Sequence, residues 1–174
     1  KFYKEIDWMS CMGLSTGNKV PGGKNYAPKD SLTREAMAAF IYRLEAPVGY
    51  AAPTESPFAD VKPGDKFYKE ITWMHAAGLS TGTQQASGKP MYSPKQALTR
   101  EAMAAFVYRL QSLVDDQVKN YQAPAVSKLV DMKSGDRFYK EINWMYDSKL
   151  TTGVNTPNGK EYQPKSSLSR EAMA

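Results

Sequence analysis

The sequence predicts a mainly α protein made of three helix-loop-helix repeats, with long loops and little or no β structure. Two observations carry this prediction. Five short sequence blocks recur three times in the same order, which is typical of repeat architectures. Within each copy, apolar residues recur at helical spacing. The composition, 41% apolar and 24% charged, is that of an ordinary globular protein.

The first block that all three copies share is the pentapeptide Phe-Tyr-Lys-Glu-Ile, at 2–6, 67–71 and 138–142. A Trp-Met pair, a Leu-Ser/Thr-Thr-Gly loop, a Tyr-x-Pro and a Leu-Thr/Ser-Arg-Glu corner follow in that order. We therefore divide the chain into copies 1–52, 53–123 and 124–174, expected to form one compact domain together. The first copy is expected to be incomplete at its start and the third at its end, so we expect the chain to be a fragment.

The first element of each copy is predicted to be an amphipathic helix. In the second copy, Phe67, Ile71 and Met74 have the i, i+4, i+7 spacing of one helix face. Gly78 follows as a left-handed cap. Lys149 stands at that position in the third copy, so we expect a different or strained helix end there.

The second helix of each copy has a clear predicted start. Hydroxyl residues that favour N-caps begin it, at Thr33, Thr99 and Ser169. In the first copy, Leu32 and Met37 have the spacing of a hydrophobic staple. Apolar residues then continue as a predicted core stripe at Met37, Phe40, Ile41 and Leu44.

Glycine-bearing turns separate the two helices of each copy. They contain Gly22-Gly23, Ser87-Gly88 and Asn158-Gly159. A short hairpin before the Tyr-x-Pro is the β element that these turns allow.

The chain carries few groups that could catalyse a reaction. The lone Cys11 aligns with Ala76 and Asp147, and the lone His75 aligns with Ser10 and Tyr146, so neither is a shared reactive group. No nucleophile–histidine pair, metal-ligand cluster or phosphate loop is apparent. Glycoside hydrolysis needs two carboxylates in different environments, which equivalent copies do not suggest. We expect no enzyme activity, metal or cofactor.

The charge balance favours an anionic partner. The net charge is +5 and the isoelectric point about 9.1. The basic residues are scattered, which argues against nucleic acid. No apolar run approaches the ~20 residues of a membrane span.

The second copy combines Phe58-x-Asp60-Val61, Trp73, the loop 78–82, Tyr92-x-Pro94 and Thr99-Arg100-Glu101. These blocks together resemble the S-layer homology (SLH) domain, over essentially the whole chain. The resemblance implies three repeats packed about a pseudo-threefold axis. It implies non-covalent anchoring of a secreted protein to a Gram-positive-type cell wall or S-layer. The ligand in this family is an acidic secondary cell-wall polysaccharide, often pyruvylated, which meets the corner arginine in grooves between repeats.

The corner chemistry is consistent with an acidic ligand. A helix N-terminus presents unpaired N–H groups, and an adjacent arginine adds a two-pronged donor for a carboxylate. In the alternative, each arginine pairs with a local acid such as Glu5 or Asp60 and only joins repeats. The tryptophans either stack on sugar rings or, slightly favoured, fill the core. The candidate ligand-binding residues are Arg34, Arg100, Arg170, Gly17, Gly82, Gly153, Thr81, Trp8, Trp73 and Trp144.

One departure concerns the acid of the corner. The order is Thr-Arg-Glu-Ala, where the family usually has Thr-Arg-Ala-Glu, so the acid stands at N2 and cannot close a capping box. Two alternatives to wall anchoring stay open: a helical scaffold for protein assembly at the cell surface, and the non-catalytic part of a wall hydrolase. Self-association at the cell surface is a further open partner.

Overall fold

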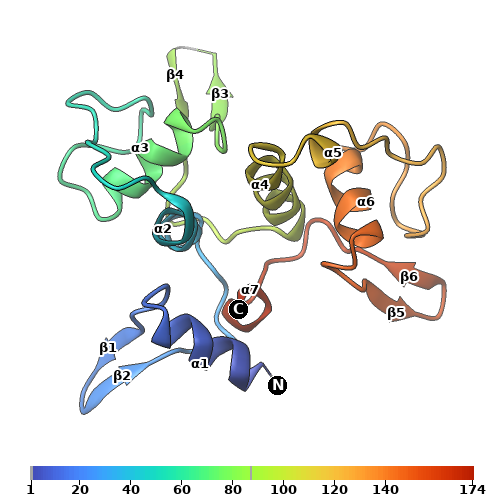
Figure 1. Cartoon of the computed structure of the whole chain (residues 1–174), viewed down its shortest axis with the longest axis horizontal. Coiled ribbons are helices and arrows are strands. Elements are labelled where there is room, and N and C mark those ends of the chain that lie inside the picture. The colour runs from blue at the N-terminus through green and yellow to red at the C-terminus, as the bar shows by residue number, and fades with distance from the viewer. Residues whose placement is uncertain (1, 87) are drawn as a thin grey trace. The chain divides into compact units, whose positions relative to one another are not determined.

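The computed structural model describes residues 2–86 and 88–174 (Figure 1). The turn expected at Ser87 lies outside these residues. The order helix, strand, strand, helix occurs three times. Its elements are α1 (Tyr3–Cys11), β1 (Asn18–Val20), β2 (Gly23–Asn25), α2 (Arg34–Glu45); α3 (Tyr68–Ala76), β3 (Thr83–Gln85), β4 (Gly88–Met91), α4 (Arg100–Ser112); and α6 (Tyr139–Asp147), β5 (Val154–Thr156), β6 (Gly159–Glu161), α7 (Arg170–Met173). A short α5 (Asp116–Lys119) follows α4.

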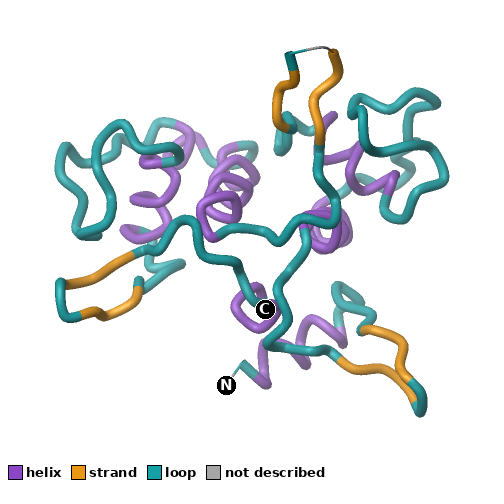
Figure 2. Tube along the Cα trace, turned by 180° about the vertical axis from the view of Figure 1, so that it is seen from behind, coloured by secondary structure: helices purple, strands orange, loops and turns teal. Residues whose placement is uncertain are grey.

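The expectation of little or no β structure is wrong. Within the described residues, every copy carries a two-stranded antiparallel hairpin, β1–β2, β3–β4 and β5–β6 (Figure 2). The chain is therefore weakly mixed α and β. The strands are short and mostly exposed, so they lack the alternation of apolar and polar residues that reveals a half-buried strand. The glycine-bearing turns between the strands were the sequence feature that indicated these hairpins.

Backbone geometry at the ends of the first helices is repeated. Each follows a phenylalanine in the left-handed conformation, with φ of 64° at Phe2, 62° at Phe67 and 60° at Phe138. Gly78 has φ of 70° as expected, and Lys149 adopts nearly the same value, 62°. Because a side chain is disfavoured there, Lys149 holds a strained helix end.

The second helices begin where the sequence predicts. The hydroxyls of Thr33, Thr99 and Ser169 accept a hydrogen bond from the third helical amide at 3.3 Å. Leu32 and Met37 are fully buried, whereas Leu44 is largely exposed. The inclusion of Leu44 in the core stripe is therefore wrong, because the last turn of α2 leaves this side chain uncovered.

The chain forms two compact units. The first contains residues up to Leu98 together with Leu168–Ala174, and the second is Thr99–Ser167. In the first unit, the corner leucines of the three copies form a closed ring of backbone hydrogen bonds. Leu32 N–H donates to Leu168 (2.8 Å), Leu98 to Leu32 (2.7 Å) and Leu168 to Leu98 (2.8 Å). The side chains of these three leucines are buried.

Candidate functional site

Each corner arginine is held by the tyrosine of a Tyr-x-Pro from another copy. In the first unit, Arg34 Nε donates to the Tyr92 carbonyl at 2.7 Å, and its guanidinium lies 4.8 Å from the centre of the Tyr92 ring. The Tyr92 hydroxyl donates back to the Arg34 carbonyl at 2.9 Å. This reciprocal contact, which we call the Tyr–Arg clasp, fixes both the side chain and the start of α2.

The clasp recurs at the other two corners. Arg170 Nε donates to the Tyr26 carbonyl in the first unit, and Arg100 Nε to the Tyr162 carbonyl in the second, each at 2.7 Å. The tyrosine hydroxyls donate back at 2.8 Å. Burial raises the pKa of Tyr162 to about 12 and that of Tyr26 above its ordinary value, although the neighbouring arginine lowers both. The clasps therefore contain neutral phenols at physiological pH.

The corner amides are already bonded within the protein. Arg34 N–H donates to the Gln96 carbonyl at 3.0 Å, and Glu35 N–H to the Pro94 carbonyl at 2.9 Å. The expectation of unpaired N–H groups for a ligand is therefore wrong at these positions. The loop after the Tyr-x-Pro satisfies them, which the sequence of a single copy could not reveal.

The displaced acid of the corner has a partner of its own. Glu35 is buried and its Oε1 lies 2.7 Å from Lys95 Nζ, while Glu101 receives Lys165 at 2.8 Å. Both lysines follow the proline of a Tyr-x-Pro. At N2 the acid therefore contacts a lysine of another copy, whereas an acid at N3 would have bonded to the N-cap amide of its own helix. The repeated Tyr-x-Pro-Lys was the signal that could have located these lysines.

Asp60, which the sequence offered as an acid partner for a corner arginine, bonds to backbone amides instead. This carboxylate accepts the backbone amides of Tyr92 and Ser93, each at 2.7 Å. The arginines join copies through tyrosine carbonyls and rings. Joining copies is thus one role of these residues, alongside any ligand contact.

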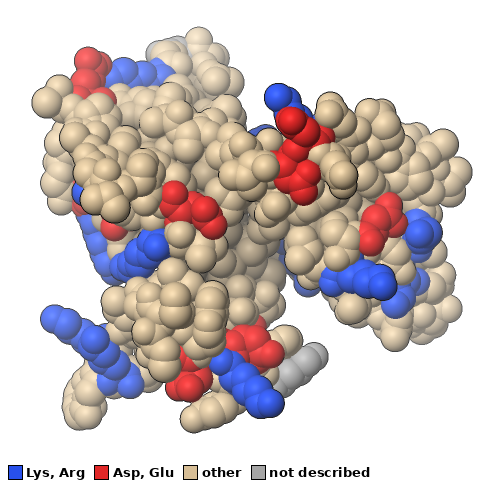
Figure 3. All heavy atoms as spheres, in the orientation of Figure 1, with Lys and Arg blue, Asp and Glu red and all other residues tan. Residues whose placement is uncertain are grey.

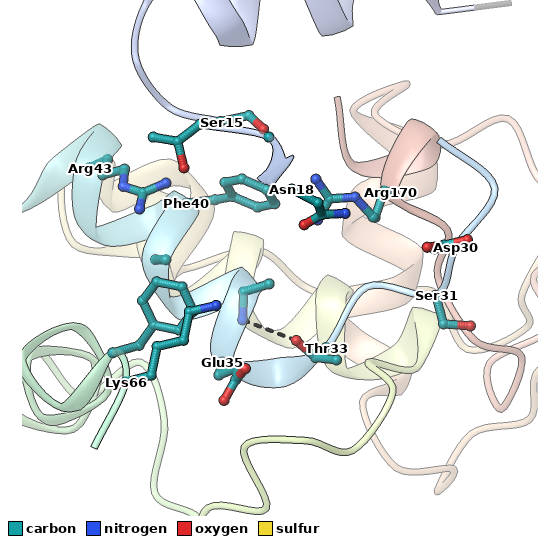
Figure 4. Close-up of a pocket in the computed structure, with 15 residues that line it drawn as sticks. Ser15, Asn18, Asp30, Ser31, Thr33, Glu35, Phe40, Arg43, Lys66 and Arg170 are labelled. Atoms are coloured by element: carbon teal, nitrogen blue, oxygen red, sulfur yellow. Dashed lines mark hydrogen bonds between the residues drawn. The ribbon is translucent and has the colours of Figure 1, made fainter. Parts of the chain in front are cut away.

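A groove of about 350 Å³ lies in the first unit beside the Arg170 clasp (Figure 4). Its walls come from the loop after α1 with the first residue of β1, the segment just before α2, one face of α2, the residues just before α3, and Arg170. The lining residues are Ser15, Thr16, Gly17, Asn18, Asp30, Ser31, Thr33, Glu35, Ala36, Ala39, Phe40, Arg43, Lys66, Phe67 and Arg170.

Three cations and two aromatic rings define the chemistry of this groove. The Arg170 guanidinium lies 6.0 Å from the centre of the Phe40 ring, and Figure 4 places Phe40 between Arg43 and Arg170. Arg43 is held by a 2.8 Å bond from Nη1 to the Leu14 carbonyl, and Lys66 lies over the Phe67 ring. Lys95 offsets the charge of Glu35. Asp30 is then the one acidic group of the lining that faces the three cations, so the net charge of the groove is positive. Such a groove suits an acidic ligand with an apolar face.

The predicted loop glycines lie in tight backbone positions. Gly17 lines the groove with φ of 69°. A Cβ at Gly82 would stand 2.8 Å from the Phe58 ring, and one at Gly153 would stand 3.0 Å from the Glu161 carbonyl. Packing against the hairpins therefore demands these glycines. Thr81, beside Gly82, is exposed.

The three tryptophans have two environments. Trp73 and Trp144 are buried, and each meets a tyrosine edge to face, Tyr42 at 5.6 Å and Tyr108 at 5.4 Å. Trp8 is 52% exposed. Of the three indoles, that of Trp8 offers an open face to solvent.

On the face drawn in Figure 3, basic and acidic side chains are interspersed. Within residues 2–86 and 88–174, no cluster of His, Cys, Asp and Glu could hold a metal ion. In the same part of the chain, every helix is too short or too polar to cross a membrane.

Comparison with protein families identifies one segment. Residues 57–104 match the model of the S-layer homology domain. This segment runs from the Phe58-x-Asp60-Val61 block through α3, the β3–β4 hairpin and the corner to the first turn of α4. The SLH domain is a binding module of bacterial cell surfaces that attaches proteins to cell-wall polymers, and it is not catalytic. Comparison with curated protein sequences gives no match.

Proposed function

We propose that the chain is a non-covalent wall-anchoring module, in which all three copies are SLH repeats and the groove beside Arg170 binds an acidic cell-wall polysaccharide. The observation that carries this proposal is the convergence of Arg43, Lys66 and Arg170 on one groove with Phe40. The match of residues 57–104 to a wall-binding family supports the class of ligand.

The groove suits a sugar acid better than a bare anion. Its volume lies within the range of small-ligand sites. Arginine offers paired donors to a carboxylate, such as that of a pyruvyl ketal, and the Phe40 ring offers an apolar surface to a sugar face. The hydroxyls of Thr16 and Thr33 and the amide of Asn18 add donors and acceptors for sugar hydroxyls.

The clasp gives the arginine its position. Nε of Arg170 is bonded to Tyr26, so the guanidinium plane is fixed. Among the described residues, its terminal nitrogens have no hydrogen-bond partner, which leaves them for a ligand carboxylate. A pre-positioned donor loses less entropy on binding than a mobile one.

Binding to purified cell-wall sacculi, before and after acid extraction of the polysaccharide, tests the proposal. We expect extraction to abolish binding to sacculi from a Gram-positive-type bacterium. Equal binding to extracted walls contradicts an acidic glycan ligand and favours a protein partner.

Single variants then locate the site. Lys66→Ala removes an exposed cation of the groove, and we expect about a fivefold to tenfold loss of affinity with unchanged thermal stability. Lys19→Ala is the matched control, because it removes the same charge from the exposed β1 strand. If Lys19→Ala weakens binding as much as Lys66→Ala, net charge and not the groove is responsible. Arg170→Ala is expected to lose both affinity and part of the clasp.

A further inference from the structure

The second and third copies hold equivalent serines in different hydrogen-bond arrangements. Ser56 and Ser127 are counterparts in the sequence, and the hydroxyl of each accepts the amide two residues further on, from Phe58 and Leu129, at 3.1 Å. In the third copy, the Ser127 hydroxyl also donates to Oδ1 of Asn143 at 2.7 Å. An amide carbonyl thus accepts the proton of this serine.

The second copy has no such acceptor, because Thr72 stands in the place of Asn143. The Thr72 hydroxyl donates to the Lys69 carbonyl at 3.1 Å and accepts the Tyr50 hydroxyl at 3.3 Å. Among the described residues, no group accepts the proton of the Ser56 hydroxyl, although this residue is only 9% exposed. Since buried donors are nearly always paired, the second copy has an open place for an acceptor like the Asn143 amide.

A pocket of about 490 Å³ lies at this place. Its volume is within the range of small-molecule sites. The pocket is contained in the segment 50–89 and shares no lining residue with the groove beside Arg170. The lining residues are Tyr50, Ala51, Pro53, Glu55, Ser56, Pro57, Thr72, His75, Ala76 and Lys89.

Two aromatic rings of the pocket are held by other rings. Tyr50 meets Tyr42 edge to face at 6.2 Å, and the His75 imidazole meets Phe58 edge to face at 5.3 Å. Two prolines of the linker add apolar surface. Rings that are fixed in this way offer a flat apolar surface to the face of a sugar ring.

The rim of the pocket is polar and carries no net charge. Lys89 Nζ lies 2.5 Å from Glu55 Oε1 and also donates to the Ser56 carbonyl at 3.0 Å. The Glu55 side chain is 82% exposed, so its carboxylate is accessible to a ligand. One ammonium and one carboxylate offset each other, which favours a neutral polar ligand over an anion.

The corresponding place of the third copy is spanned by charged side chains. Asp147, the counterpart of Ala76, accepts the Tyr121 hydroxyl at 2.6 Å and lies 3.3 Å from Lys128 Nζ. Ala76 is exposed and has no side-chain group that could bond to Tyr50, the counterpart of Tyr121. The pocket is therefore specific to the second copy in both its missing acceptor and its open rim.

We propose that this pocket binds a neutral N-acetylated sugar, such as an N-acetylhexosamine unit of a glycan. The acetamido carbonyl accepts the proton of the Ser56 hydroxyl, as Oδ1 of Asn143 does for Ser127. The sugar ring lies against Tyr50, and its hydroxyls bond to the Glu55 carboxylate at the rim. The site is separate from the acidic groove and does not rest on the anchoring function proposed above.

Titration of the whole chain with N-acetylglucosamine, followed in the ¹H–¹⁵N spectrum, tests this site. We expect the amide signals of Ser56, Thr72 and Ala76 to shift, with a dissociation constant in the millimolar range. Glucose, which lacks the acetamido group, should bind at least fivefold more weakly, because the Ser56 hydroxyl then stays without an acceptor.

The amide of Nε-acetyl-lysine distinguishes a sugar from an acetylated protein, since it offers the same acetamido group without a sugar ring. It should also bind at least fivefold more weakly than N-acetylglucosamine. Binding of acetyl-lysine as tight as that of the sugar would overturn the sugar assignment. Equal binding of glucose, or unmoved signals at tens of millimolar N-acetylglucosamine, would overturn the site.

Variants that introduce residues of the third copy provide the matched test. Thr72→Asn supplies the amide that Asn143 supplies there, so we expect it to occupy the Ser56 hydroxyl and to abolish sugar binding. Ala76→Asp changes an exposed residue to the acid found at 147, and at least a fivefold loss is expected.

Ala86→Asp is the control, because it adds the same charge at an exposed turn outside the pocket, and affinity should stay within twofold. Thermal melts check that each variant is folded. Wild-type affinity in a folded Thr72→Asn or Ala76→Asp variant would overturn the proposal, as would an equal loss in Ala86→Asp.

Discussion

The first helices of the first and second copies have nearly the same sequence and very different burial. In α1, Met9 is the one buried residue, whereas α3 buries Tyr68, Ile71, Thr72, Trp73 and Met74. Both follow a phenylalanine in the same left-handed conformation. The difference therefore does not come from the local sequence or backbone.

The neighbours of the two helices account for the difference. On one side of α3, Trp73 contacts Tyr42 of α2, and on another, His75 contacts the buried ring of Phe58. In the described part of the chain, the ring of Trp8 has no such aromatic partner, and Trp8 is 52% exposed. A copy is thus a supersecondary unit that buries its apolar face only against adjacent segments, as in repeat proteins generally.

Replacing the tryptophans should give the largest contrast between the two copies. Trp73→Ala removes a buried indole and its edge-to-face contact, and we expect a loss of about 3–5 kcal/mol in the free energy of unfolding. Trp8→Ala should cost less than about 1 kcal/mol, because half of that side chain is already in water. Urea denaturation of both variants measures the difference. Equal losses would mean that the Trp8 side is covered in solution.

Removing an aspartate that accepts two consecutive backbone amides should have the next largest effect. Asp60→Ala leaves the amides of Tyr92 and Ser93 without an acceptor, and we expect a loss of about 2–3 kcal/mol. Asp131→Ala should behave alike in the third copy. Asp7, exposed on α1, provides the control, and Asp7→Ala should stay within about 0.5 kcal/mol by the same denaturation measurement.

The sequence predicted more of the local structure than of the contacts between copies. The N-caps at Thr33, Thr99 and Ser169 and the left-handed cap at Gly78 followed from local chemistry, and the structure confirms them. At Lys149 a different or strained end was expected, and the structure shows the same left-handed conformation, which is strained for a residue with a Cβ. The hairpins were underestimated, because strands of three or four exposed residues carry no hydrophobic period.

The residues that bond to the corner could not be predicted from the sequence around it. The amides of Arg34 and Glu35 are satisfied from residues about 60 positions away, which helix propensity cannot reveal. The same is true of the Tyr–Arg clasp. Internal alignment could have paired Glu35 with Lys95, since an acid and a lysine recur at fixed places in each copy.

The tyrosine hydroxyl of a Tyr–Arg clasp should make the free energy of unfolding depend on alkaline pH, and a variant that lacks this hydroxyl should not show this dependence. Burial raises the pKa of Tyr162 to about 12 from 10.0, so the folded protein keeps this proton where the unfolded chain has lost it. The stability from this residue is therefore complete below pH 10 and is lost as the pH rises from 10 toward 12, by about 1.4 kcal/mol at pH 11. Tyr162→Phe cannot titrate.

The measurement is the difference in unfolding free energy between the wild type and Tyr162→Phe at pH 8 and pH 11. At pH 8 the variant should be less stable by about 1 kcal/mol, since it lacks the bond to the Arg100 carbonyl. By pH 11 we expect this deficit to vanish or reverse. A constant deficit would show that the phenol does not lose its proton preferentially on unfolding.

The smallest expected effect compares the ends of α3 and α6. Lys149 holds φ of 62° where Gly78 holds 70°, and this conformation costs a residue with a Cβ roughly 1 kcal/mol. Lys149→Gly should therefore stabilise the protein by up to about 1 kcal/mol, less what glycine adds to the entropy of the unfolded chain. Gly78→Lys should destabilise it by a similar amount, because nothing within 4 Å of its Cβ position prevents the side chain from fitting. Opposite signs in thermal melts would trace both effects to backbone strain; two losses would show that Lys149 makes a favourable contact that outweighs its strain.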